Sequence, residues 1–170
     1  IDTSTFANGE GKIPLTNYGT IEVSESIDLT TISNSGIITT PIINTSSITN
    51  SGTITATNAF TATNYLRPTD STSDVVDIKE GATLSITNDA TISTLNVESP
   101  TNDFATISTN GNLTISSATY NSADIQTSGI IKLPDTTEDN KIGSLKIESG
   151  ELTIEKLHVN SLNVVEGTID

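Results

Sequence analysis

The sequence predicts an all-β fold, a parallel β-helix or related β-solenoid, on three observations. Strand-favouring residues dominate the composition: 31 of the 170 residues are Thr and 23 are Ile, and both are β-branched and stiff at χ1. A short phrase recurs along the chain. No stretch keeps a 3.6-residue apolar periodicity for three turns, so no helix is expected.

The clearest repeats are "LTNYGTIEV" (15–23), "ISNSGIITT" (32–40) and "ITNSGTITA" (48–56). Their glycines, Gly19, Gly36 and Gly52, are 17 and 16 residues apart. A fixed period of this kind indicates units that bury their apolar sides only against their neighbours. Each phrase is therefore predicted to form one rung, meaning one full turn of a coiled chain.

Later phrases are related but more loosely spaced, and they begin at or beside Gly81, Gly111, Gly129 and Gly150. We expect one continuous domain of about nine or ten irregular rungs. Within it, residues 1–14 are predicted to be a lead-in or cap, 15–64 a short-rung solenoid, and 65–170 a longer-rung solenoid with loop excursions.

Two kinds of position within the phrase have a physical interpretation. Segments after each glycine alternate, as in "TITAT" (53–57), which is typical of strands with one buried face. Asn followed by Gly suits a corner, because Asn tolerates left-handed backbone and Gly takes positive φ without a clash. Stacked corners would place Asn17, Asn34 and Asn50 above one another and allow an amide ladder.

Three stretches combine Pro with Asp, Asn, Ser or Thr, which is the composition of loops that leave a strand path. They are "YLRPTDSTSDVVD" (65–77), "ESPTND" (98–103) and "LPDTTEDN" (133–140).

Charge and composition exclude several classes of function. The net charge of −14 disfavours binding to nucleic acid or to an anionic membrane. No apolar run of about 18 residues is present, so membrane insertion is not expected. The absence of Cys excludes disulfides and thiolate metal sites, and 4% aromatic residues favour a thin core over a large globular one.

The "ITNSGTI"-type phrases, over about residues 15–63, resemble the β-helical stalks of bacterial surface adhesins, namely autotransporter passengers and filamentous-haemagglutinin-like proteins. Residues 110–154, which contain "SGIIKLPDTTEDNKIGSLKI", are similar to repeats in the fibres of phages and large viruses. Both resemblances imply an elongated, extracellular, non-enzymatic β-structure, formed by one winding chain or by three.

Calcium is the metal that the acidic loops would suit, because hard cations prefer several oxygen ligands on a flexible loop. The candidate ligands are Asp74, Asp77, Asp135 and Asp139. Solvated loop charges that discourage edge pairing are the alternative interpretation. No cofactor is required by this account.

Catalysis has few candidate residues. His158 is the one histidine and lies in an alternating segment, where a packed or solvated strand position is the simpler interpretation. A carbohydrate-active β-helix enzyme stays open as an alternative, with paired carboxylates supplied by Asp70, Asp74 and Asp77 or by Asp135, Glu138 and Asp139. Sugar clefts usually add aromatic and basic residues, and Arg67 is the only arginine here.

The sequence therefore predicts a structural, self-associating segment of an extracellular fibre, filament or surface layer, and adhesion to a host glycan or surface receptor would fit it. A solenoid exposes unpaired strand groups at its last rung, and "SLNVVEGTID" (161–170) still has strand character. We expect either further chain or another copy of the chain to meet it. The alternatives are a trimeric phage or viral fibre segment in function, and a β-sandwich with antiparallel hairpins in fold.

Overall fold

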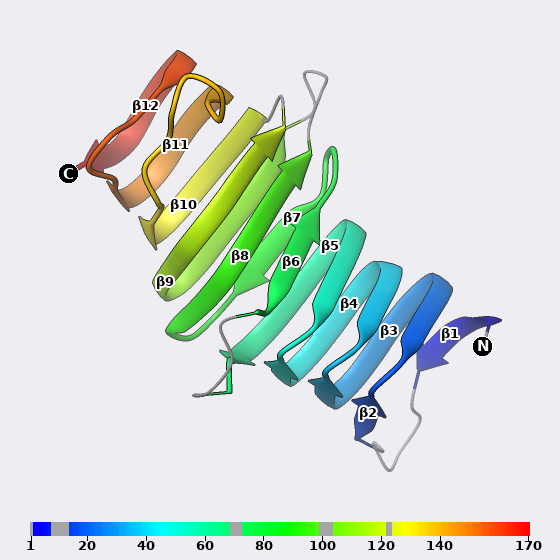
Figure 1. The fold of residues 1–170 in the computed structure, drawn as a ribbon. Helices are drawn as coiled ribbons and strands as arrows, with labels where there is room; N and C mark the ends of the chain where they lie inside the picture. The colour runs from blue at the N-terminus through cyan, green and yellow to red at the C-terminus, as the bar shows by residue number, and fades with distance from the viewer. Residues whose placement is uncertain (1, 8–13, 69–72, 99–103, 122–123) are drawn as a thin grey trace.

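The computed structural model describes residues 2–7, 14–68, 73–98, 104–121 and 124–170. Within these ranges the chain is all-β and winds into a parallel β-solenoid of about 8 turns. The N- and C-termini lie at opposite ends of the long axis, and the strands run across that axis (Figure 1). The described residues contain no helix that is long and apolar enough to cross a membrane.

Twelve strands form one continuous coiled sheet. They are β1 (Asp2–Ala7), β2 (Leu15–Asn17), β3 (Thr20–Asn34), β4 (Ile37–Asn50), β5 (Thr53–Leu66), β6 (Val75–Ile78), β7 (Thr83–Ile86), β8 (Ala90–Glu98), β9 (Ala105–Asn121), β10 (Asp124–Lys132), β11 (Ile142–Thr153) and β12 (Val159–Ile169).

Every pairing between these strands is parallel. The only antiparallel contact among the described residues is the isolated bridge between Thr137 and Asn140. A β-sandwich built from antiparallel hairpins is therefore excluded, and the predicted solenoid is confirmed.

A complete rung has three strand segments, separated by register shifts or bends. In the β4 rung they are residues 37–40, 42–45 and 47–50, which we call faces A, B and C. The Asn-x-Gly corner separates face C of one rung from face A of the next, as at Asn34 and Gly36. In later rungs, separate strands such as β6 and β7 supply faces A and B.

The core is a set of ladders in which each apolar residue lies on its equivalent in the next rung. The longest runs along face B from β3 to β12 and is apolar except for one Thr, through Ile27, Ile43, Phe60, Leu84, Ile107, Thr127, Ile147 and Val164. The members from β3 to β11 are almost completely buried. Because neighbouring strands are about 4.8 Å apart, each side chain packs directly on the one below it.

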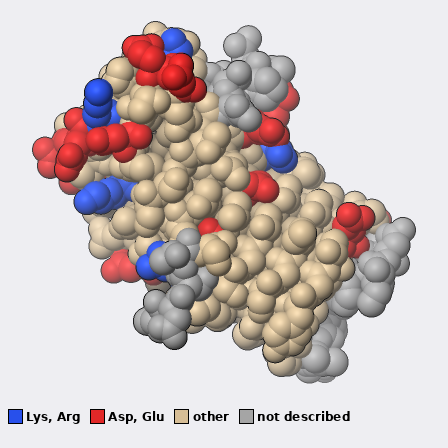
Figure 2. Space-filling model, in the orientation of Figure 1, with Lys and Arg blue, Asp and Glu red and all other residues tan. Residues whose placement is uncertain are grey.

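The exterior divides by charge. Residues 29–66 contain no charged side chain, and the visible face over β3–β5 is nearly free of charge in Figure 2. Acidic and basic side chains gather over β10–β12, at the upper left of that view. The β4 and β5 rungs therefore present an uncharged surface of hydroxyl, amide and apolar groups, whereas β3 carries Glu22, Glu25 and Asp28.

Two expectations about the rungs need adjustment. The solenoid makes about 8 turns, fewer than the expected nine or ten. Loops lengthen the later turns: equivalent residues are 16 apart between Asn34 and Asn50 but 24 apart between Asn64 and Asn88. In addition, the lead-in over 1–14 contains a strand, since β1 already pairs with β3; residues 8–13 lie outside the described part.

Adjacent isoleucines of β4 offer a matched test of the core ladder. Ile43 is 0% exposed within the face B ladder, whereas Ile42 is 39% exposed beside it. We expect Ile43→Ala to lower the free energy of unfolding by about 2–5 kcal/mol, because it leaves a cavity between Ile27 and Phe60. Ile42→Ala should cost less than about 1 kcal/mol. Urea unfolding followed by circular dichroism measures both; equal losses would contradict the ladder.

Candidate functional site

The corners of the first rungs are joined by a buried amide ladder. Asn17 Nδ2 donates to Asn34 Oδ1, and Asn34 Nδ2 donates to Asn50 Oδ1, each at 2.8 Å. The three side chains are at most 5% exposed. This is the arrangement that the 17- and 16-residue spacing predicts, because the spacing places each Asn directly above the previous one.

Each Asn also folds its own corner. The backbone N–H groups of Gly19, Gly36 and Gly52 donate to the Oδ1 atoms of the asparagines two residues earlier. The side-chain amides return hydrogen bonds to the carbonyl groups of the same glycines. The amide therefore holds the bend and links rungs at once, which explains why Asn occupies this position rather than Asp or Ser.

The ladder ends at a buried tyrosine and carboxylate. Asn50 Nδ2 donates to the Tyr65 hydroxyl at 3.0 Å, and that hydroxyl donates to Asp74 Oδ2 at 2.8 Å. Asp74 is 0% exposed and also accepts from the backbone N–H of Ser93 at 3.1 Å. All the ladder's donors point the same way along the axis, and Asp74 accepts the last of them.

Arg67 connects to this network from the surface side. Its Nη1 donates to the Ser93 hydroxyl at 3.0 Å, and the backbone N–H of the same Ser93 binds Asp74. Asp74 Oδ1 has no hydrogen-bond partner among the described residues. Burial, followed by the charge of Asp74, raises the pKa of Tyr65 well above its usual range, so its hydroxyl stays a proton donor at neutral pH.

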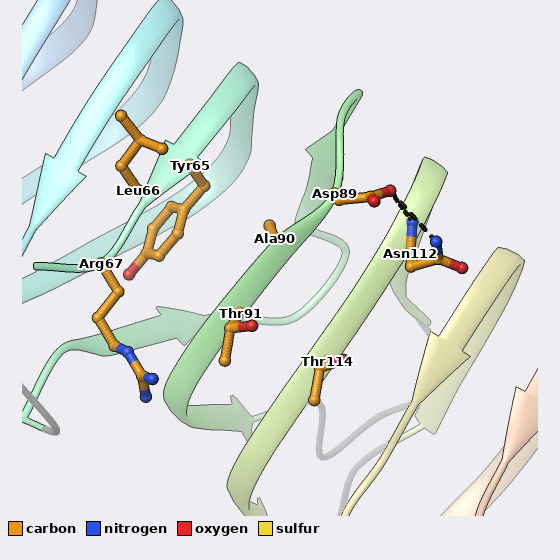
Figure 3. Close-up of a pocket in the computed structure, with 8 residues that line it drawn as sticks. All are labelled: Tyr65, Leu66, Arg67, Asp89, Ala90, Thr91, Asn112 and Thr114. Carbon is orange, nitrogen blue, oxygen red and sulfur yellow. Dashed lines mark hydrogen bonds between the residues drawn. The ribbon is translucent and has the colours of Figure 1, made fainter. Parts of the chain in front are cut away.

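A hollow lies beside Arg67, where face C of the solenoid is interrupted. Residues 64–66 of β5 pair with β4, and residues 90–92 of β8 pair with β9, but these two described segments do not pair with each other. The hollow between them has a volume of about 460 Å³. Figure 3 shows its lining of Tyr65, Leu66, Arg67, Asp89, Ala90, Thr91, Asn112 and Thr114.

The other glycines predicted as corners occupy two kinds of position. Gly81, with φ 68°, lies in the turn between β6 and β7. Gly111, Gly129 and Gly150 lie inside β9, β10 and β11, so the chain bends there without a break in the strand. Gly129 has φ 87°, and a Cβ there would lie 2.0 Å from the Thr109 carbonyl oxygen, so only glycine fits.

The four aspartates proposed for calcium occupy different surroundings. Asp74 is buried, and Asp77 accepts from Thr55 Oγ1 and Asn96 Nδ2 on an outward row of face A. Asp135 accepts from the Lys156 backbone N–H, while Asp139 is exposed. No group of three or more His, Cys, Asp or Glu side chains within the described ranges is placed to hold a metal ion. Calcium binding by these residues stays a prediction, and Asp70 lies outside the described residues.

His158 lies in a contact between two loops. Its Nδ1 is 3.0 Å from Glu138 Oε1, and its backbone N–H donates to the Thr136 hydroxyl. The hydrogen bond from His158, together with Lys141, holds the pKa of Glu138 below its usual value. The histidine therefore anchors the 133–141 loop against residues 154–158, as a packed position would.

The last described rung differs from the others in its exposure. On β12, Leu162 and Val164 stack on the buried Leu145 and Ile147 of β11 but are themselves 45% and 42% exposed. They continue the apolar ladders with nothing above them among the described residues. The outer edge of β12 is correspondingly unpaired in this part of the chain.

Two of these features are not evident from the phrase pattern. The Tyr65 hydroxyl accepts the hydrogen bond that continues the ladder, but Tyr65 pairs with Ile48 and does not follow the register of Asn50, so the spacing of the asparagines gave no signal for it. The hollow depends on a lapse of pairing between β5 and β8, which no local motif encodes.

No protein family model matches this chain, and neither a curated protein nor a solved structure is significantly similar to it. A function can therefore be inferred only from the fold and from the geometry of the chain's own residues.

The ladder's end can be tested by removing one hydroxyl. Tyr65→Phe should lower the free energy of unfolding by about 1–3 kcal/mol, because it removes a buried hydroxyl that accepts from Asn50 and donates to Asp74, and each of these loses one hydrogen bond. Tyr120→Phe is the control, because the buried Tyr120 hydroxyl has no partner among the described residues; its change should be within about 0.5 kcal/mol of zero. Equal losses on urea unfolding would contradict the proposed end of the ladder.

Alkaline pH should destabilise the fold through both buried tyrosines. Burial raises the pKa of Tyr65 and of Tyr120, so each stays protonated when folded but ionises when unfolded above about pH 10. Their contribution is complete below that pH, and each should lose about 1.4 kcal/mol per pH unit above it. The Tyr65→Phe, Tyr120→Phe double variant should show a shallower decline in urea unfolding measured across this range. An unchanged slope would contradict the role of these two hydroxyls.

Proposed function

We propose that this chain is a structural, self-associating segment of an extracellular fibre, filament or surface layer. The observation that supports this most is the β12 rung, which continues the apolar ladders of β11 and leaves Leu162 and Val164 about half exposed. An unpaired strand edge with exposed apolar residues is a template for another strand.

The partner that fits this surface is a second copy of the chain. All strand pairings are parallel, and the first rung, β1 with β2, lies at the opposite end of the axis from β12 (Figure 1). A copy stacked in the same direction would continue the coil with parallel pairing and the same rung spacing. Head-to-tail contacts of this type do not close, so they generate filaments.

The uncharged surface of the β4 and β5 rungs is compatible with such an assembly, and these rungs lie between the two ends that would meet. Because residues 29–66 carry no charge, the β4 and β5 rungs are free of side-chain charge repulsion, and the net charge of −14 is concentrated elsewhere. That charge keeps the sides of a filament apart in solution. Adhesion to a glycan or receptor would then be a property of the filament's side.

Self-association is tested by mass and shape in solution. Light scattering and negative-stain microscopy should show particles well above 17.8 kDa at raised protein concentration, as rods of one width. Val164→Lys places a charge on the open ladder and should reduce association at least tenfold. Val165→Lys is the control, because Val165 is exposed beside it but belongs to no core ladder.

The outcomes separate the alternatives. Circular dichroism must show that both variants keep the β-fold. A monomer near 17.8 kDa at every concentration would contradict self-association, and a discrete trimer would favour the phage or viral fibre segment. New ultraviolet absorbance on incubation with an acidic polysaccharide would favour the carbohydrate-active enzyme. Repeating the experiment with added calcium tests whether Asp74, Asp77, Asp135 and Asp139 matter for assembly.

A further inference from the structure

The interruption of face C has defined limits on all sides. At one end the walls close through hydrogen bonds from Asn88, whose N–H binds the Thr63 carbonyl and whose Nδ2 binds Asn64 Oδ1. At the other end they close through Arg67 and Ser93. An extended peptide therefore cannot run along the strand direction between β5 and β8, whereas a compact ring can enter from the side.

The lining combines an apolar floor with polar walls. Tyr65 and Ala90 are inward-facing and at most 9% exposed, so they close the base of the hollow, and Leu66, which is 53% exposed, is the accessible apolar side chain of the lining. Thr91 and Thr114 stand on adjacent strands on the far wall (Figure 3). The volume of about 460 Å³ lies within the range of small-ligand sites.

Opposite charges stand at the two ends of this hollow. Asp89 Oδ1 is already occupied, since it accepts from the N–H of Asn112 at 2.8 Å and from its Nδ2 at 3.3 Å. Arg67, the only arginine of the chain, is partly buried, and among the described residues one of its five N–H donors is bound, by Ser93. Its remaining donors are suited to a carboxylate, which a guanidinium binds in a two-pronged manner.

We propose that this hollow binds one carboxylate-bearing sugar ring of an acidic glycan. The sugar's carboxylate would bind Arg67, its hydroxyls would bind Thr91, Thr114 and Asp89, and its C–H face would lie on Leu66. A polyol is the ligand that matches hydroxyl, amide and carboxylate groups arranged around an apolar floor. This inference extends the adhesive part of the proposed function and places adhesion on the side of the solenoid.

A ligand site would also explain why the sheet is interrupted at this place. An interrupted sheet face forfeits backbone hydrogen bonds between β5 and β8, although faces A and B continue through β6 and β7 without interruption. An Arg in a strongly acidic protein beside a gap in an otherwise continuous sheet is the kind of local exception that a ligand site produces.

The test uses glucuronate as the probe, with glucose and acetate as the matched ligands that lack either the carboxylate or the ring. Ligand-observed NMR titration should give a dissociation constant for glucuronate in the millimolar range, typical of a single sugar, and at least tenfold weaker binding for glucose and for acetate. Equal binding of acetate would show that the ring contributes nothing. Equal binding of glucose would exclude a role for the guanidinium, and no binding of glucuronate would overturn the proposal.

Variants locate the binding. Arg67→Gln should weaken glucuronate at least tenfold, whereas Lys146→Gln, which removes a positive charge from the face B segment of β11, should not. Because Arg67 also contacts Ser93, Thr114→Val is the second variant: it removes a lining hydroxyl without touching that network, and it should weaken glucuronate several-fold at unchanged stability. Binding that both variants leave intact would place the ligand elsewhere and overturn the proposal.

The experiment is carried out on wild type and on Val164→Lys. Val164→Lys separates the two proposals. Its loss of association tests the filament, and its retained binding of glucuronate tests the hollow. If sugar binding requires association, the site is not the hollow within one chain, and this inference is wrong.

Discussion

In-register parallel pairing between rungs is the constraint on which the rest of this structure depends. It places each residue about 4.8 Å from its equivalent in the next turn, so side chains of the same type stack on one another along the axis. Apolar residues then form core ladders such as Ile27–Ile43–Phe60. Amides form the Asn17–Asn34–Asn50 ladder. At the corners the same spacing leaves no room for a side chain, since a Cβ on Gly36 would lie 2.0 Å from the Gly19 carbonyl oxygen.

The same constraint governs where charges occur. Like charges stacked one strand apart are destabilising, and most of the paired residues avoid that arrangement, with the pair of Asp2 and Glu22 as an exception. Asp77 lies between Thr55 and Asn96, both of which donate to it, and Asp28 accepts from Asn44. Where charges stack more densely they are opposite, as in the Lys79–Glu98 ion pair. Stability is thus summed over neighbouring rungs rather than held by one core, and the exposed edge of β12 follows directly from that design.

Much of this could be predicted from the sequence, because local repetition encodes it. The alternation of apolar and polar residues predicted the buried faces of the strands, and the spacing of Asn17, Asn34 and Asn50 predicted the amide ladder. The loop near residues 133–141 followed from Pro beside Asp and Thr, whereas parts of the other two predicted loops, residues 69–72 and 99–103, lie outside the described part. The end of the ladder at Tyr65 and Asp74 was not predicted, because it joins residues whose spacing departs from the repeat. The hollow was missed for a related reason, since it arises where two segments fail to pair.

The account's central claim is that one chain winds as a parallel solenoid whose rungs stack along the axis of a larger assembly. X-ray diffraction from aligned assemblies tests it most directly, because the spacing between strands produces a reflection at about 4.8 Å. The account predicts this reflection along the assembly axis, since the strands run across that axis in every rung. A reflection perpendicular to the axis would mean that strands run along the assembly, and the stacking of rungs end to end would then be wrong.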